Sequence, residues 1–165
     1  MMTTSKRSLN PLHISAIIEL INASPYFSLL SIVVKDIGIG YSKIETTVQD
    51  KHLNPFGGIH GGVYSSLIDT AAYWSAFCDL PEDRGLISID VTVNNLAAVD
   101  SGRIFIEGKS IKIGKSICLA EAQITDEKNV IISHGISKMM VIKGKQTIDH
   151  IIKTSGINSL PEKFI

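Results

Sequence analysis

A nearly uncharged segment of helical length, from about His60 to Cys78, constrains the fold of this chain most strongly. Small and apolar residues recur through it at helical spacing, and after His60 its one acidic or basic side chain is Asp69. A helix without a charged face is buried nearly all round in a folded protein. The rest of the chain must therefore supply a surface that wraps this helix.

Runs rich in β-branched and aromatic residues lie on both sides of the segment. Short turns containing Gly, Asp or Asn separate the last four runs. These three connections are too short for a crossover helix, which favours antiparallel pairing. We predict an α+β fold, a curved antiparallel sheet of about six strands wrapped around the long central helix. The predicted strands cover roughly 27–34, 41–48, 86–96, 103–111, 116–125 and 130–142.

The two ends of the chain carry weaker signals. Asn10-Pro11 is typical of a helix start, apolar residues then recur to Ile21, and Ser24-Pro25 predicts the end of that helix. A short helix is expected near 147–153, with the rest of the tail poorly fixed. The chain is thus divided into an N-terminal segment 1–26, a main domain 27–142 and a tail 143–165.

Composition excludes several function classes. The 165 residues are 44% apolar and 19% charged with zero net charge, as in one ordinary globular domain. Zero net charge argues against nucleic acid or an anionic membrane as the main partner and leaves self-association unopposed. No apolar run is long enough for a bilayer, and Met1–Ser8 lacks the apolar core of a signal peptide, so we expect the cytoplasm.

The loop that enters the central helix carries the candidate chemistry. From Asn54 it is rich in Gly, and the helix start beyond it offers free backbone N–H groups to a carbonyl oxygen or an anion. Asp69 follows eight residues after Gly61 and has few polar neighbours in the sequence. Burying such a carboxylate costs free energy unless it is paired or takes part in function. Asp69 can serve as a structural partner for the helix, but a base close to an oxyanion donor suggests acyl chemistry.

The spacing of these two groups predicts an oligomer. Eight residues of helix rise roughly 12 Å at about 1.5 Å per residue. One carbonyl group cannot accept a hydrogen bond from Gly61 while its carbon is attacked from Asp69 of the same helix. A second copy of the helix, packed antiparallel, brings Asp69 of one chain near Gly61 of the other. We therefore expect a homodimer with shared sites.

The pattern Asn54-(five residues)-His60-Gly61-Gly62-(six residues)-Asp69 resembles the hotdog-fold acyl-CoA thioesterases, specifically the PaaI-like and THEM2-like group. The resemblance continues in the strand 88–94 and the turn 112–116, and covers roughly 27–141. It implies a hotdog thioesterase domain over 27–142, acyl-CoA as substrate, and sites at a dimer interface, with dimers that often pair into tetramers.

By position, the resemblance assigns Asp69 as general base or nucleophile and the Gly61 N–H as the group that polarises the thioester carbonyl. Asn54 would position the carbonyl or the water, and Ser88 would support the attacking water. The substrate-binding candidates are His60, Gly62, Lys112, Gly114 and Lys115. Two departures stand out: Asn95 replaces a common aromatic residue, and Lys112 and Lys115 replace common arginines, so phosphate would meet point charges there.

Plainer interpretations remain for these residues. His60 can cap the helix, Asn54-Pro55 is a common turn former, Ser88 can be an ordinary strand serine, and the lysines can lie on a solvated sheet edge. The five histidines show no metal-ligand spacing, so we expect no metal and no cofactor. The two cysteines lie in apolar segments and are predicted to be buried free thiols, Cys78 and Cys118.

Two alternative functions stay open. One is an acyl-thioester hydratase or dehydratase of the same fold, although the Gly-Gly after His60 and the acid at Asp69 match the thioesterase pattern better. The other is a non-catalytic acyl-CoA-binding module. No DNA-binding segment is visible, because the N-terminal helix has only Lys6 and Arg7 nearby. The acyl group itself is not fixed by the sequence.

Overall fold

The computed structural model describes residues 8–165, so the expectations for Met1–Arg7 lie outside the described residues. The described part forms helices, one 3₁₀ turn and strands in the order α1 (Pro11–Asn22), α2 (Pro25–Leu30), β1 (Val33–Gly38), β2 (Tyr41–Thr47), η1 (Asp50–His52), α3 (Gly61–Phe77), β3 (Arg84–Asn95), β4 (Arg103–Ile113), β5 (Ile117–Thr125), β6 (Ile131–Lys143) and α4 (Ile148–Ser155).

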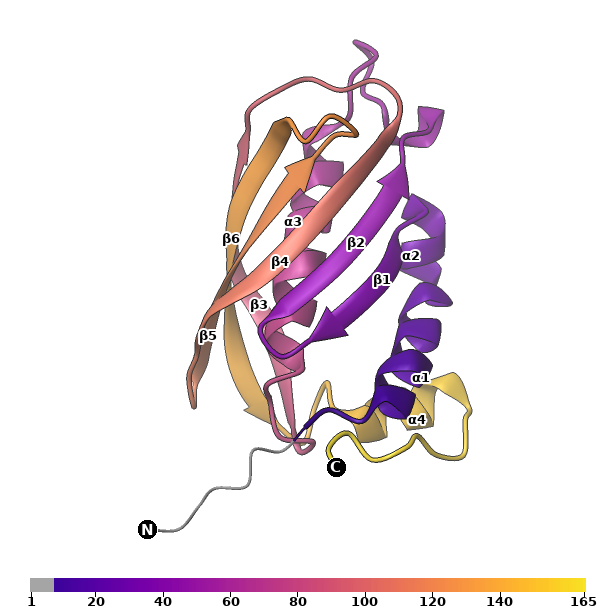
Figure 1. Cartoon of the computed structure of the whole chain (residues 1–165), viewed down its shortest axis with the longest axis vertical. Coiled ribbons are helices and arrows are strands. Elements are labelled where there is room, and N and C mark those ends of the chain that lie inside the picture. Colours follow the sequence, from indigo (N-terminus) through magenta and orange to yellow (C-terminus); the bar gives the residue numbers. More distant parts are fainter. Residues whose placement is uncertain (1–7) are drawn as a thin grey trace.

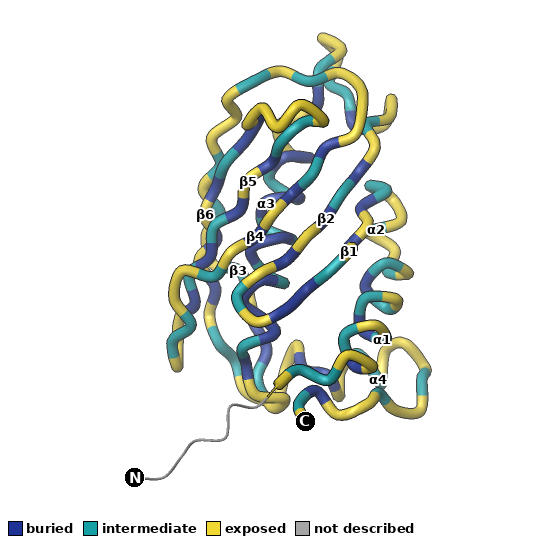
Figure 2. The backbone as a smooth tube through the Cα atoms, in the orientation of Figure 1, coloured by how far each residue is buried: buried dark blue, intermediate teal, exposed yellow. Residues whose placement is uncertain are grey.

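One antiparallel sheet holds all six of these strands, in the order β1-β2-β4-β5-β6-β3. The sheet curves around α3, which runs along its inner face (Figure 1). Along the strands, buried and exposed residues alternate, because successive side chains point to opposite faces (Figure 2). The predicted fold class is confirmed.

Small residues allow α3 to lie close to the sheet. Ala71 and Ala72 are fully buried on the helix face toward the sheet. A Cβ at Gly108 of β4 would collide with the Ala71 carbonyl, so only glycine fits there. The Ser42 hydroxyl in β2 donates to the same carbonyl oxygen at 2.7 Å. This close packing fixes where along the sheet each functional residue of α3 stands.

The two edges of the sheet are treated differently. At β1, the Asn22 side chain at the end of α1 hydrogen-bonds to both backbone polar groups of Val34. Its Nδ2 donates to the Val34 carbonyl at 3.0 Å, and its Oδ1 accepts from the Val34 N–H at 2.8 Å. The β3 edge has no such cover among residues 8–165, and Ile87 and Ile89 on it are 40% and 54% exposed. An open, partly apolar edge strand is a template for pairing with another chain.

Burial of α3 departs from the prediction in one respect. Most of the helix is buried, but three adjacent pairs of residues, spaced four residues apart, form one half-buried stripe along it. The prediction of burial nearly all round is therefore wrong for a single chain. The stripe comprises Ser65, Ser66, Asp69, Thr70, Tyr73 and Trp74.

Two local predictions are also wrong. The run 27–34 was expected to be a strand, but its first part continues α2, and β1 begins only at Val33. Ser24-Pro25 ends α1 and also starts α2, since Ser at the N-cap with Pro at the first helical position is a helix-start signal. The remaining predicted elements, including the short helix near 147–153, are confirmed within a few residues.

The end of the tail is firmly held, against expectation. The Lys163 side chain is 2% exposed, and its Nζ donates to the carbonyls of Phe77 and Leu80 at 2.8 and 2.7 Å. Phe77 is the last residue of α3 and Leu80 lies three residues beyond it, so the ammonium group caps the turn that ends the helix. Burial lowers the pKa of Lys163 to about 8. The tail therefore anchors the far end of the central helix.

Candidate active site

Asp69 lies halfway along α3, on the half-buried stripe. Its Oδ1 accepts two hydrogen bonds, from the Ser88 hydroxyl in β3 at 2.8 Å and from the Ser137 hydroxyl in β6 at 2.9 Å. Neither serine reaches the other carboxylate oxygen, and Oδ2 has no protein donor within the described part of the chain. The carboxylate is thus fixed through one oxygen while the other is available to a water or a substrate.

An apolar cleft of about 650 Å³, here called the acid cleft, opens beside Asp69. It runs between α3, the end of β6, α4 and the start of α2. Burial raises the pKa of Tyr73 in its wall to about 12, so that phenol is neutral at physiological pH. Its apolar and aromatic lining is Phe27, Tyr73, Trp74, Phe77, Ile87, Ile142 and Ile151.

At the start of α3, His60 is the N-cap residue. Its Nδ1 accepts the Gly62 N–H at 2.9 Å, and its carbonyl accepts the Val63 N–H at 2.9 Å. These bonds satisfy two of the free donors at the helix start. The Gly61 N–H has no acceptor within residues 8–165. The capping interpretation of His60 is confirmed, while its role in substrate binding stays a prediction.

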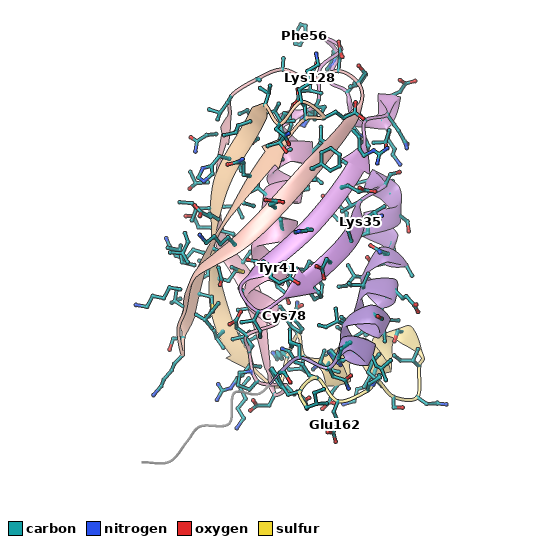
Figure 3. The ribbon with its side chains drawn as sticks, viewed as in Figure 1. Lys35, Tyr41, Phe56, Cys78, Lys128 and Glu162 are labelled. Atoms are coloured by element: carbon teal, nitrogen blue, oxygen red, sulfur yellow. The ribbon has the colours of Figure 1, made fainter. Side chains whose placement is uncertain are left out.

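Asn54 closes the turn before the helix. Its Oδ1 accepts the Phe56 N–H at 2.8 Å, and its backbone joins Gly57 and Gly58 through two further hydrogen bonds. The turn-forming interpretation is confirmed. Because Oδ1 is engaged in the turn, Nδ2 is the group that Asn54 has available to a ligand. Phe56 at the tip is 96% exposed and projects from the end of the molecule (Figure 3).

A second, smaller cleft of about 320 Å³, here called the amide cleft, surrounds the start of α3. It contains Gly61 and Asn54 together with the end of β3 and the loop that follows. Its lining residues are Asn54, Gly58, Ile59, Gly61, Tyr64 and 95–98, none of them charged. The amide cleft and the acid cleft have no residue in common. Within one chain, the candidate base and the candidate carbonyl donor therefore face different spaces.

The sequence interpretation missed Ser137. It is fully buried, and its hydroxyl holds Asp69 as closely as Ser88 does. The signal was present: β6 buries every second residue from Ser133 to Met139, so a serine at 137 has to face the helix. The Ser88 hydroxyl contacts the Asp69 carboxylate itself, and its role toward an attacking water stays a prediction.

The comparisons with known proteins bear on this geometry. A family model described as the thioesterase superfamily matches residues 56–133, which include α3 and all residues that line the amide cleft except Asn54. Over this region, which is just under half of the chain, the sequence is similar to the thioesterase superfamily. Members of this superfamily are thioester hydrolases, so the recognition made from the sequence motif is confirmed at the level of a hotdog-fold thioesterase, while the PaaI-like and THEM2-like group stays a prediction.

The individual relatives are distant in sequence. A 1,4-dihydroxy-2-naphthoyl-CoA hydrolase of Listeria monocytogenes is 29% identical over 103 residues, 62% of this chain and 84% of that protein. Mouse acyl-coenzyme A thioesterase 13 is 27% identical over 86 residues, 50% of this chain and 59% of that protein. A solved thioesterase structure from Haemophilus influenzae is 23% identical with a TM-score of 0.74, over 80% of this chain and 92% of that one. The architecture is the hotdog fold.

Three of the predicted substrate-binding residues lie away from both clefts. Lys112, Gly114 and Lys115 occupy the hairpin between β4 and β5, and both lysines are exposed. None of the three lines the acid cleft or the amide cleft. Their role toward a CoA phosphate stays a prediction.

Other chemistries find less support in the site. Both cysteines are buried free thiols, as predicted, and burial raises the pKa of Cys78 to about 12, so it is not an activated nucleophile. No group of three potential metal ligands clusters among residues 8–165. None of the helices described is long and apolar enough to cross a membrane.

Proposed function

We propose that this chain is an acyl-CoA thioesterase that works as a homodimer with two shared sites. The observation that carries the proposal is the Asp69 carboxylate, which two serines hold by one oxygen at the mouth of an apolar cleft. The 1,4-dihydroxy-2-naphthoyl-CoA hydrolase and the acyl-coenzyme A thioesterase among the relatives support the substrate class. In each site, Asp69 of one chain would act with Gly61 of its partner.

The sheet edges support a dimer formed through β3. The β1 edge is blocked by Asn22, whereas the β3 edge is open and carries exposed isoleucines. The same side of the molecule carries Asp69, because Ser88 of β3 contacts it. A two-fold axis beside β3 would cover the open edge and the half-buried stripe of α3 together. Pairing of such dimers into tetramers is part of the same proposal.

The mechanism follows from the two half-sites. The thioester carbonyl would accept the Gly61 N–H of one chain, at the positive end of α3. Asp69 of the partner would act through Oδ2, either by taking a proton from an attacking water or by adding to the carbonyl carbon itself. The C=O π electrons move to oxygen, and on collapse the C–S bond breaks and CoA leaves as the thiolate. When Asp69 acts as base, the thiolate takes up the proton that Asp69 removed from water, and the free acid is formed directly. When Asp69 acts as nucleophile, the acyl–Asp69 anhydride is then cleaved by water, which gives the free acid, restores the carboxylate and supplies the proton of the thiol. An oxyanion donor of this type lowers the activation barrier by about 3–4 kcal/mol.

The alternative of a hydratase or dehydratase would place a histidine in the chemistry. Here the Nδ1 of His60 is occupied by the Gly62 N–H, and the ring serves the helix start. That contact favours hydrolysis as the reaction. A non-catalytic binding module would keep both clefts and release no thiol.

Thiol release tests the proposal. The purified protein is incubated with acetyl-, hexanoyl-, decanoyl- and phenylacetyl-CoA, and free CoA is followed with a chromogenic disulfide. We expect turnover of at least one of these thioesters. Binding of the same compounds without thiol release would support the non-catalytic module, and hydration of an enoyl-CoA without thiol release would support the hydratase.

A further inference from the structure

Asn95 is the last residue of β3 and lies opposite Ser133 of β6. Ser133 is fully buried, and its hydroxyl donates to the Asn95 Oδ1 at 3.0 Å. The same hydroxyl lies 3.2 Å from the Asn94 carbonyl oxygen. The amide oxygen of Asn95 is therefore held toward the sheet by a side chain that is itself locked in place.

The amide nitrogen of Asn95 faces the start of α3. A methyl group placed on Gly61 would lie 3.5 Å from the Asn95 Nδ2. Because Oδ1 is engaged by Ser133, Nδ2 is the donor that Asn95 presents. Asn95 lines the amide cleft together with Gly61 and Asn54. Three neutral donors from three different elements thus converge on one small space.

The character of this cleft suits an acceptor that gains negative charge during a reaction. No acidic or basic side chain of the same chain lines it, so the donors that this chain supplies are all neutral. Donors that are fixed in advance and aimed at a developing oxyanion lower the barrier, because they need no reorganisation as the charge forms. The Gly61 N–H has this property through the helix, and Asn95 has it through Ser133.

We propose that the Asn95 Nδ2 is a second oxyanion donor beside the Gly61 N–H, and that Ser133 is its positioning residue. The assignment rests on the proposed thioesterase function. As oxygen from water or from Asp69 of the partner bonds to the thioester carbon, the carbonyl oxygen takes up the π electrons and accepts both hydrogen bonds. When the C=O double bond re-forms, the C–S bond breaks and both contacts weaken.

The first experiment compares Asn95→Leu and Asn95→Asp with the neighbouring control Asn94→Leu. Asn94 is exposed and its side chain lies 3.5 Å from the His134 carbonyl, outside both clefts. We expect kcat to fall about 10- to 100-fold in Asn95→Leu with little change in KM, and further in Asn95→Asp, which adds a repelling charge. Asn94→Leu should keep wild-type kcat.

A binding experiment separates this role from a structural one. Two unreactive CoA ligands are compared, a ketone in which CH₂ replaces the thioester sulfur and an S-alkyl thioether that lacks the carbonyl. Asn95→Leu should weaken binding of the ketone and leave the thioether unchanged. Equal losses for both ligands would mean that Asn95 only maintains the shape of the cleft, and would overturn the proposal.

A double-mutant cycle tests the part played by Ser133. Ser133→Ala should lower kcat by a smaller factor than Asn95→Leu, and the double variant should be no slower than Asn95→Leu alone. Additive losses would contradict the positioning role. Thermal melting of each variant accompanies the kinetics, and Asn95→Asp, which preserves size, decides the case if Asn95→Leu does not fold.

The outcomes keep the two proposals apart. If wild-type protein hydrolyses no CoA thioester, the proposed function fails. If it does and Asn95→Leu is as fast as Asn94→Leu, the thioesterase function stands and the role of Asn95 is wrong.

Discussion

The acid cleft and the amide cleft are built on the same helix but differ in almost every physical property. The acid cleft is large and apolar, and helices that lie outside the matched family region form part of its wall. The amide cleft is half that volume, uncharged, and made of a turn, a helix start and a strand end. One can hold an apolar acyl group beside a fixed carboxylate, and the other can only offer neutral donors. The difference indicates that each chain supplies complementary halves of a site.

The largest effect should come from the carboxylate of the acid cleft. Asp69→Asn keeps the serine contacts but has no basic oxygen to take a proton, so kcat should fall by about 10²- to 10⁴-fold. Thiol release measures the loss, and gel filtration should show an unchanged dimer. Asp79→Asn is the matched control, because Asp79 is also half-buried near the end of α3 and accepts the Gly40 N–H at 2.8 Å. Full activity of Asp69→Asn would remove Asp69 from the mechanism.

The next effect should come from filling the amide cleft. A Cβ at Gly61 meets the Asn95 amide at an ordinary contact distance and no backbone atom, so Gly61→Ala should fold. The methyl group would occupy space meant for the carbonyl, and we expect kcat/KM to fall roughly 10-fold in Gly61→Ala and more in Gly61→Val. Unchanged kcat/KM in both variants, measured by thiol release, would show that the carbonyl binds elsewhere.

Loosening the carboxylate should cost less than removing it. Ser137→Ala deletes one of the two hydrogen bonds to the Asp69 Oδ1. Such a bond to a charged group is worth roughly 1.5–3 kcal/mol, and with Ser88 still in place we expect kcat to fall about 10-fold. Ser75→Ala is the control, since Ser75 is equally buried on α3 but bonds only to the Ala72 carbonyl. Equal kinetics in the two variants would contradict the role of Ser137.

The smallest effect should be on substrate choice. Trp74 lines the acid cleft and packs edge-on against Tyr73 and Phe77, at centroid distances of 5.2 and 5.1 Å. Trp74→Leu should lower kcat/KM for decanoyl- or phenylacetyl-CoA by about 10-fold relative to acetyl-CoA, because lost apolar contact affects the longer acyl groups most. A uniform change across all acyl lengths would place the acyl group outside this cleft.

The sequence predicted the architecture because the decisive signals are local. The uncharged helix, the alternating strands and their short turns each depend on neighbours in the chain. The element that was mispredicted, α2, begins with Ser24-Pro25, a dipeptide that signals both an ending and a start. The burial of Lys163 was not predicted for another reason. Its partners Phe77 and Leu80 are some 80 residues away in the chain, and no local sequence pattern indicates such a contact.

The candidate site shows the same limit. Asp69, Gly61 and Asn54 stand out because they belong to one motif, and the structure places each of them at one of the two clefts. Ser137 and Asn95 come from β6 and β3, and their importance depends on the register that sets them beside α3. Register is a tertiary property, so the residues that fix the carboxylate and the amide emerge only from the fold.

Subunit mixing tests the central claim most directly. Asp69→Asn and Gly61→Val protein are prepared separately, each almost inactive, then unfolded together and refolded so that their chains exchange. If the site is shared, half of the dimers are mixed and each mixed dimer has one intact site, so activity should recover to about one quarter of the wild-type value. No recovery in a sample shown to contain mixed dimers would mean that each chain works alone, and would contradict the account.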